Sequence, residues 1–238
     1  MLKTIKIATY NIKHGGTLGK NCEAIGRLIA QEQVDIVGLQ EVDYNISRSN
    51  KQDIVATIAK YANYPYYRFY KAITFSDGDY GCGIISKYPI NDVSVLPLSH
   101  CQEQRILVET TIEIDRQQLP FFVTHLELGS YQDIRRHQFA EIHKQVSKHD
   151  CFILTGDFNV YDWNQEGMIF EYQEYLGSYQ ILNRPGRTYY TYHSDYHVEE
   201  IGPIDNIITS HDFKLKRVYM IHNHFSDHNL FVGEFELS

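Results

Sequence analysis

The sequence lacks a long apolar run, a paired cysteine motif and any low-complexity segment, and these absences exclude several classes of protein. No apolar run approaches the roughly 20 residues that a membrane-spanning helix needs, so we expect no stable membrane anchor. The first residues, MLKTIKIATY, lack the charged and then apolar pattern of a secretory signal. Glycine (15) and proline (6) are too scarce for a collagen-like or low-complexity chain. We therefore expect a globular protein in the cytoplasm.

The four cysteines are scattered along the chain, without a C-x-x-C pair. Cys22, Cys82, Cys101 and Cys151 could form two disulfides in three ways. A chain of 238 residues buries roughly 70% of the surface that it exposes when unfolded, so its core needs no covalent or metal staple. The sequence favours buried free thiols in a reducing compartment.

Basic residues are also in the minority, with 22 Lys and Arg against 30 Asp and Glu and a formal net charge of -8. Proteins that grip duplex DNA through its phosphates usually carry a basic face, because neutralised phosphates release counterions. The charge therefore disfavours long duplex DNA as a partner. It does not disfavour a phosphate-ester substrate or a shorter nucleic acid, since a bound metal ion reverses the local field of an acidic cleft.

Hydrophobic patterning predicts alternating strands and helices, with no linker or internal repeat. Apolar residues at helix spacing predict helices at 21–33, 52–61 and 132–148, the first capped by Asn21, and a loop and helix follow residue 154. Many strands with few helices indicate one domain of stacked sheets with helices outside. The predicted strands are 4–10, 35–40, 66–73, 81–86, 93–98, 105–114, 119–126, 151–154, a segment near Tyr189, 204–209, 213–221 and 230–237.

Polar side chains recur where these predicted strands end. Singly, each has an ordinary explanation: Glu41 could be a surface charge, Asp157 a turn residue and Asp227 a cap. Their repetition at strand ends favours a shared cleft, because loops held by a rigid scaffold commonly carry function. The set is Asn11, Glu41, His125, Asp157, Asn159, Asp205, Asp227 and His228.

A series of short blocks resembles the endonuclease/exonuclease/phosphatase superfamily, in that family's order and over nearly the whole chain. The blocks are TYNI at 9–12, LQEVD at 39–43, GIISKYPI at 83–90, THL at 124–126, GDFN at 156–159, IDNI at 204–207 and SDHN at 226–229. The resemblance implies an α/β fold, a four-layer αββα sandwich of two mixed, mostly antiparallel sheets flanked by helices. It also implies a single domain over residues 1–238.

The resemblance implies a metal site centred on Glu41. Glu41 resembles the principal Mg²⁺ ligand of the family, with Asn11 beside it and Asp227 as a further ligand; Mn²⁺ is the alternative ion. Mg²⁺ takes oxygen ligands, keeps several waters and commonly uses one or two carboxylates, which fits this set. The chain departs from some nucleases of the family at Lys13, where they carry a second acid, so the sequence disfavours a two-carboxylate metal site.

The other matching positions resemble residues that act on the phosphate. Asp157 and Asn159 resemble the pair that orients the attacking water, and His228 resembles a histidine paired with a carboxylate, here Asp205. Such a pair can hold an imidazolium that neutralises phosphoryl charge or moves a proton. The resemblance assigns phosphate contacts to His125, and the candidate phosphate-binding arginines are Arg105 and Arg135.

The leading hypothesis from the sequence is a Mg²⁺-dependent phosphoesterase that acts on a phosphodiester or a phosphomonoester. Alternatives are a nuclease acting on DNA or RNA, a lipid- or inositol-phosphate hydrolase, and an inactive binding module that uses the same fold. His222 and His224, with His228 nearby, could also form a zinc site. The tyrosine-rich stretches 61–70 and 189–196 could stack on a base, a sugar or a headgroup.

Overall fold

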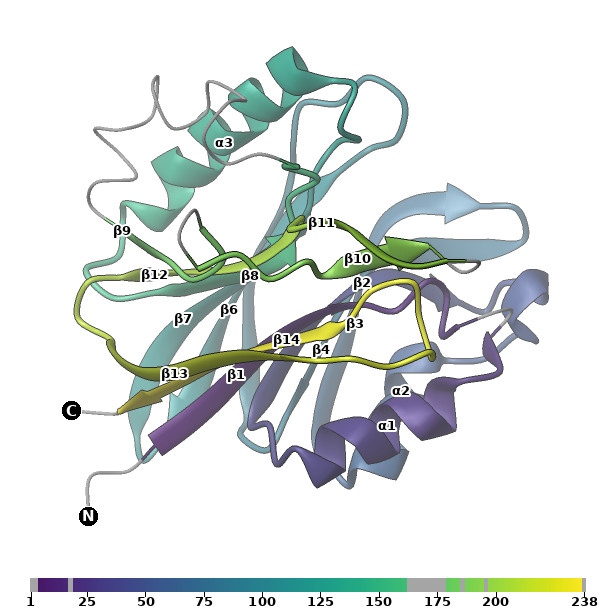
Figure 1. Cartoon of the computed structure of the whole chain (residues 1–238), viewed down its shortest axis with the longest axis horizontal. Helices are drawn as coiled ribbons and strands as arrows, with labels where there is room; N and C mark the ends of the chain where they lie inside the picture. The colour runs from purple at the N-terminus through teal and green to yellow at the C-terminus, as the bar shows by residue number, and fades with distance from the viewer. Residues whose placement is uncertain (1–3, 17–18, 162–178, 185–186, 195–196, 237–238) are drawn as a thin grey trace.

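The structure is a computed structural model that describes residues 4–16, 19–161, 179–184, 187–194 and 197–236. Two six-stranded mixed sheets pack face to face, with helices on their outer faces (Figure 1). This is the α/β sandwich that the sequence predicts, and the fold class is confirmed. The loop and helix expected after residue 154 include residues 162–178, which lie outside the described residues.

The first sheet has the strand order β13-β14-β1-β2-β4-β3, and the second has the order β5-β6-β7-β8-β12-β9. Strands β10 and β11 form a separate two-stranded hairpin. The strands of the first sheet are β1 (Thr4–Asn11), β2 (Ile36–Tyr44), β3 (Tyr66–Phe75), β4 (Gly78–Ser86), β13 (Lys214–Ile221) and β14 (Leu230–Glu236). The others are β5 (Ile90–Pro97), β6 (Ile106–Ile114), β7 (Gln117–His125), β8 (Ile153–Asp157), β9 (Tyr179–Ile181), β10 (Tyr192–Ser194), β11 (His197–Gly202) and β12 (Asp205–Ser210).

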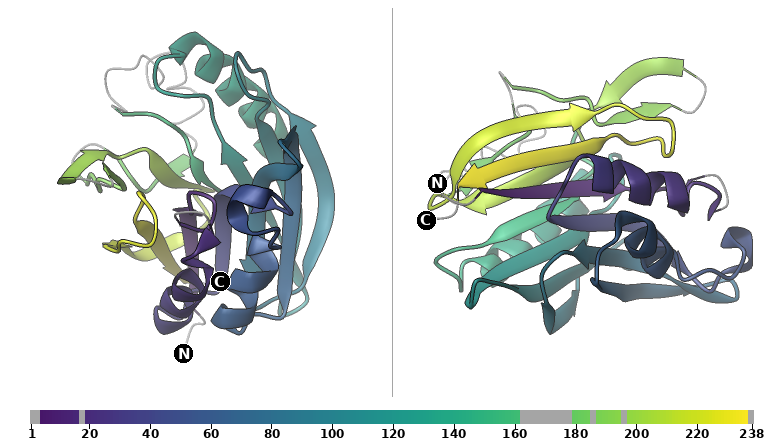
Figure 2. Two further views of the ribbon diagram at one scale, coloured as in Figure 1. Left: turned by 90° about the vertical axis from the view of Figure 1, so that its right-hand side faces the viewer. Right: turned by 90° about the horizontal axis from the view of Figure 1, so that it is seen from below.

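Three apolar clusters separate the layers. The central one lies between the sheets and contains Ile7, Phe121 and Phe231. The second packs α1 (Cys22–Gln31) and α2 (Ile54–Ala62) against the first sheet, and the third packs α3 (Gln132–Val146) against the second sheet. Figure 2 shows the same layers from two further directions. Because β6 is covered on both faces, its burial is nearly continuous rather than alternating.

Several element boundaries differ from the prediction. Strand β2 continues to Tyr44 rather than ending at residue 40, because a bulge between Leu39 and Val42 carries its pairing with β4 past Glu41. The strand predicted near Tyr189 begins only at Tyr192. Asn21 occupies the N-cap position of α1 but makes no capping bond, since its side chain donates to the carbonyl of Phe225.

All four cysteines are free thiols, as the sequence favours, but they are not all buried. Cys22 and Cys82 are buried, Cys101 is exposed and Cys151 is partly exposed. Within the described ranges, none of the helices combines the length and apolar character needed to cross a membrane.

Gly38 of β2 packs directly against Thr155 of β8 in the other sheet. A Cβ at position 38 would overlap the Thr155 hydroxyl and lie 2.9 Å from a methyl carbon of Val123. We expect Gly38→Ala to lower the free energy of unfolding by about 1–3 kcal/mol, the cost of overpacking a dense core. Urea denaturation followed by circular dichroism measures this loss.

A matched pair tests that explanation. Thr155→Ala removes the overlapping hydroxyl, so Gly38→Ala should cost less stability in the Thr155→Ala background than in the wild-type chain. Equal costs in the two backgrounds would show that the close approach is not the cause.

Candidate active site

Strand register brings most of the predicted site residues to one end of the sandwich. Strand β7 runs parallel to β8 with His125 opposite Asp157, and β12 runs antiparallel to β8 with Asp205 opposite Asp157. In the other sheet β1 runs parallel to β2, which places Asn11 beside Gln40 and next to Glu41. In-register pairing within each sheet therefore places these residues at the same end of the sandwich.

Asn11 connects the two sheets at this end. Its side-chain Nδ2 donates to Glu41 Oε1 and to Asp157 Oδ2, each at 3.0 Å. Its Oδ1 accepts a bond from the backbone N–H of Lys13 at 3.1 Å. Asn11 is fully buried, so this amide fixes the spacing of two carboxylates that come from different sheets.

A chain of polar contacts runs from Asp205 through His228 to Asp157. Nδ1 of His228 lies 2.7 Å from Asp205 Oδ2, and its Nε2 lies 3.8 Å from Asp157 Oδ2. Asp157 Oδ1 accepts a bond from the backbone N–H of Asn159 at 3.0 Å, and the Asn159 side chain donates to the carbonyl of Leu126. All of these polar side chains are buried, so few of their positions can vary.

Burial and neighbouring charges shift the pKa values of Asp157 and His228. Burial and then the negative charge of Asp205 raise the pKa of Asp157, His228 opposes them, and the resulting pKa is about 7. Burial alone would lower the pKa of His228, but the carboxylates of Asp205, Asp157 and Asp227 together outweigh it and raise this pKa to about 10. At neutral pH His228 is therefore an imidazolium, and the pH is close to the pKa of Asp157.

His125 faces Asp157 from the other side and is held by Arg105. Arg105 Nη1 lies 3.1 Å from His125 Nδ1 and 2.9 Å from Glu103 Oε1, and His125 Nε2 lies 3.6 Å from Asp157 Oδ2. Burial and then the charge of Arg105 hold the pKa of His125 well below its usual range, so this ring is neutral. Arg105 is 5% exposed, so it supports His125 rather than standing at the surface of the cleft.

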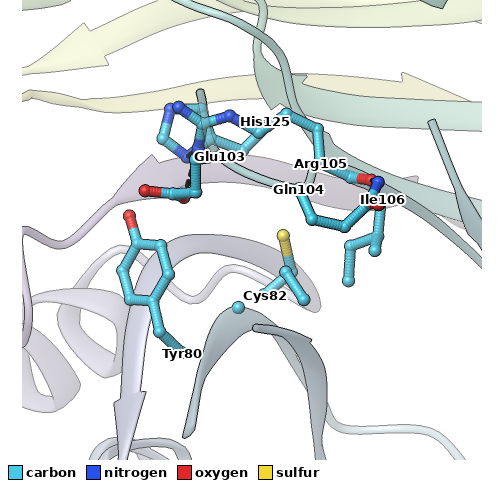
Figure 3. A pocket seen from close by; sticks show the side chains of 9 residues that line it. Tyr80, Cys82, Glu103, Gln104, Arg105, Ile106 and His125 are labelled. Carbon is cyan, nitrogen blue, oxygen red and sulfur yellow. Dashed lines mark hydrogen bonds and ion pairs between the residues drawn. The ribbon is translucent and has the colours of Figure 1, made fainter. Parts of the chain in front are cut away.

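A small recess of about 10 Å³, enough for a single water, lies beside His125. Its lining includes Tyr80, Cys82, Glu103 and Arg105, and Figure 3 shows the Tyr80 hydroxyl directed toward the Glu103 carboxylate. Burial and the nearby Glu41 and Glu103 charges raise the pKa of Tyr80 well above its usual range, so the phenol remains protonated.

Arg135 lies apart from these groups. Its guanidinium is fully buried and donates to the backbone carbonyls of Glu127, Leu128 and Gly129. In this structure Arg135 therefore anchors the chain that follows His125, a role that the sequence analysis missed. Its spacing from Gln138, which donates to Ser99 and accepts from Glu127, was the available signal.

Two places offer ligands for a cation. Asp157, Asp205 and His228 present ligand atoms within 4.8 Å of one another. Among the described residues, this is the one cluster of three or more such side chains that could hold a metal ion. Within this group, Nδ1 of His228 is already bonded to Asp205 Oδ2. Glu41 is 25% exposed and opens to solvent, which suits an ion that keeps water ligands.

The predicted metal ligand Asp227 lies between Lys13 and His228. Its Oδ2 lies 3.0 Å from the Lys13 ammonium, and its Oδ1 lies 4.0 Å from His228 Nε2. A lysine therefore already supplies positive charge beside this carboxylate. His222 and His224 are not part of the cation-binding group above, so the described structure gives no support to a zinc site there.

Sequence reasoning also missed His14, which lies beside Glu41. His14 Nε2 is 3.7 Å from Glu41 Oε2, and Arg48 Nη2 is 3.1 Å from His14 Nδ1. Burial lowers the pKa of His14, and the nearby Glu41 carboxylate opposes that shift. The signal available in the sequence was its position three residues after Asn11, directly before Gly15 and Gly16.

Comparisons with known proteins agree with this fold. Residues 8–228 match the model of the Endonuclease/Exonuclease/phosphatase family, and the chain belongs to that family. Members of the family are hydrolases that act on phosphoester bonds, and this chain has their fold. No curated protein matches the sequence.

Solved structures with the same fold differ widely from this chain in sequence. An endonuclease/exonuclease/phosphatase from Beutenbergia cavernae has a TM-score of 0.80 at 17% identity, over 99% of this chain and 72% of that one. D. rerio TDP2, complexed with a single-strand DNA product, has a TM-score of 0.76 at 15% identity, over 99% and 100% of the two chains. The human nocturnin catalytic domain, with a bound sulfate anion, has a TM-score of 0.72 at 18% identity, over 99% and 94%.

Proposed function

We propose that this chain is a divalent-metal-dependent phosphoesterase that hydrolyses a phosphodiester or phosphomonoester by attack of water. The observation that carries the proposal is the Asn11 amide that joins Glu41, a solvent-facing carboxylate, to Asp157, a buried one, with 3.0 Å contacts to both. One carboxylate suits a cation and the other suits a water proton, so the amide joins two complementary functions.

In this proposal Asp157 accepts the proton of the attacking water, and Asn159 helps to fix its position. The raised pKa of Asp157, about 7, lies close to neutral pH, where a general base is most effective. The imidazolium of His228, held by Asp205, neutralises charge that develops on the phosphoryl oxygens or protonates the leaving oxygen. Arg105 holds Nδ1 of neutral His125 as an acceptor, so the proton is on Nε2. The Nε2–H group then donates a hydrogen bond to a phosphoryl oxygen.

Glu41 would hold the metal ion, with Asn11 as the adjacent amide that fixes the Glu41 carboxylate. Mg²⁺ is the proposed ion and Mn²⁺ the alternative, since both accept oxygen ligands and water. When bound, such an ion acts as a Lewis acid toward phosphoryl or leaving oxygens. The Lys13–Asp227 ion pair supports one ion rather than two, because the ammonium already neutralises the second carboxylate.

The proposed substrate is a small or single-stranded phosphate ester rather than long duplex DNA. The net charge of -8 supports this restriction, because it opposes the approach of a polyanion. One observation favours the nuclease alternative: the similar TDP2 structure holds a single-strand DNA product. The lipid- or inositol-phosphate alternative has no such observation, and an inactive module would not need Glu41, Asp157, Asn159 and His228 together. A cytoplasmic location stays a prediction of the sequence.

Metal dependence tests the proposal directly. We expect EDTA to abolish hydrolysis of bis-p-nitrophenyl phosphate, and Mg²⁺ or Mn²⁺ to restore it. Glu41→Gln should raise the metal concentration that gives the half-maximal rate by at least about tenfold. Mutation of residues that merely hydrogen-bond to metal ligands already weakens metal binding by that factor. Calorimetric Mn²⁺ titration should show the same weakening without substrate.

Glu113→Gln is the matched control, because Glu113 pairs with Gln118 at the opposite end of β7 from His125. The same assay with single- and double-stranded DNA, RNA, inositol phosphates and sphingomyelin separates the substrate classes. Metal-independent hydrolysis, or no hydrolysis of any substrate by the wild-type chain, would contradict the proposal.

A further inference from the structure

His14 and Arg48 form a side-chain pair beside Glu41 that the proposed mechanism does not use. Arg48 Nη2 lies 3.1 Å from His14 Nδ1, and the His14 side chain is 25% exposed. His14 follows β1, whereas Arg48 lies in the short 3-10 helix Ser47–Ser49 after β2. The contact therefore joins two segments that leave the active-site end of neighbouring strands.

Arg48 is held firmly by groups behind it. Its Nε and Nη2 donate to the two oxygens of Asp43 at 2.8 Å and 2.6 Å, and the Asp43 side chain is fully buried. The guanidinium also lies over the ring of Phe75, with its central carbon 4.4 Å from the ring centroid. The bidentate ion pair with Asp43 and the contact with the Phe75 ring together fix the orientation of the guanidinium, which is directed at His14.

This contact selects one form of the His14 ring. Arginine can only donate a hydrogen bond, so Nδ1 of a neutral His14 is the acceptor and Nε2 carries the proton. Nε2 lies 3.7 Å from Glu41 Oε2, beyond the range of a hydrogen bond. The Nε2–H group is therefore a donor directed at the edge of the candidate metal site without being bonded to Glu41.

The backbone is strained where it presents this ring. Lys13, His14 and Glu41 have φ angles of 41°, 59° and 54°, in the left-handed region that non-glycine residues rarely adopt. The His14 N–H donates to the Glu41 carbonyl at 2.9 Å, which ties the two strained residues together. Strain of this kind costs about 1–3 kcal/mol per residue and is concentrated at functional sites.

The same arrangement occurs across the cleft at His125. There Arg105 holds Nδ1 at 3.1 Å, and Nε2 lies 3.6 Å from Asp157. Tyr80 lies between the two arrangements, because its ring centroid is 5.8 Å from that of His14 and its hydroxyl side lines the recess beside His125 (Figure 3). Each candidate carboxylate thus has its own arginine-backed histidine.

We propose that His14 is a substrate-binding residue whose Nε2–H donates to an oxygen of the phosphate ester on the Glu41 side of the cleft, and that Arg48 is its positioning residue. This inference rests on the phosphoesterase function proposed above. It assigns the ester two histidine N–H donors, His125 beside Asp157 and His14 beside Glu41, in addition to His228.

Kinetics of three His14 variants test the contact with substrate. We expect His14→Ala and His14→Phe to lower kcat/KM on bis-p-nitrophenyl phosphate by about tenfold to hundredfold, typical of a lost hydrogen bond to a charged group. His14→Gln should lose less, because its amide nitrogen can replace Nε2–H. His137→Phe, at an exposed position of α3, is the control and should keep the wild-type rate.

Two measurements separate positioning by Arg48 from a merely structural role. Nitrogen-15 NMR of the imidazoles should show His14 with its proton on Nε2 in the wild-type chain and as a tautomer mixture in Arg48→Met. If Arg48 acts through His14, the double variant His14→Phe/Arg48→Met should be no slower than His14→Phe alone.

The outcomes are distinct. Rates of the His14 variants within twofold of wild type, or a wild-type His14 proton on Nδ1, would overturn this inference while the phosphoesterase function stands. Additive losses in the double variant would overturn the positioning role of Arg48. A wild-type chain without metal-dependent hydrolysis would overturn the proposed function and this inference together.

Discussion

Asp157→Asn is expected to lower kcat by about 10²- to 10⁴-fold, the contribution that a positioned general base commonly makes. The amide keeps the size of the side chain, and its oxygen can still accept the N–H of Asn159, but it cannot take a proton from water. Rates on bis-p-nitrophenyl phosphate with saturating Mg²⁺ measure the loss. Asp133→Asn, at an 88% exposed side chain of α3, is the matched control.

Stability should change in the opposite direction. A carboxyl group whose folded-state pKa is raised, as for Asp157, loses stabilising free energy as the pH rises through that pKa. Above about pH 7 the variant therefore should unfold at the same urea concentration as wild type or at a higher one. Equal losses of activity and stability would instead indicate that the substitution damages the fold.

The second large effect is expected at His228. His228→Ala should lower kcat by a similar factor and also lower the free energy of unfolding by about 3–5 kcal/mol, because it leaves the Asp205 carboxylate buried and unpaired. Asp205 is fully buried, and its Oδ1 has no hydrogen-bond partner in the described structure. Equilibrium denaturation and steady-state kinetics measure the two losses separately.

A double variant separates the two effects. Asp205→Asn/His228→Ala removes the stranded charge, so it should recover much of the stability of wild type while remaining as inactive as His228→Ala. The pKa of His228 is raised from 6.5 to about 10 in the folded chain, so its stabilisation is complete below about pH 6.5 and is lost as the pH rises to 10. The stability difference between wild type and His228→Ala should therefore shrink over that interval. A difference that grows with pH would contradict the assigned ion pair.

The sequence predicted the layered fold and most strands, since both follow from local patterns, but it ended β2 at residue 40 rather than Tyr44. Asn11, Asp157 and Asp205 each lie at the end or start of a strand, and parallel or antiparallel pairing then determines that they meet. The β-branched and alternating runs that define those strands are visible in the sequence.

Side-chain direction was not predictable in the same way. Arg135 follows a helical pattern that does not reveal which way its guanidinium turns, and the structure directs it to three backbone carbonyls. His14 lies in a turn with left-handed backbone angles, and the spacing of apolar residues does not predict such a turn. Arg48 reaches His14 only through a contact between residues 34 positions apart. Such contacts depend on tertiary packing, which outweighs local preference.

The position of β14 has a consequence for the folding of the candidate site. Strand β14 pairs with both β1 and β13, so the C-terminal strand lies inside its sheet rather than at an edge. The Ser226 hydroxyl just before it bonds to the carbonyl of Asn11, 215 residues away. The candidate site therefore forms late in folding, because β14 must insert between β1 and β13, over contacts of high sequence separation, before the Ser226 hydroxyl can hold the end of β1.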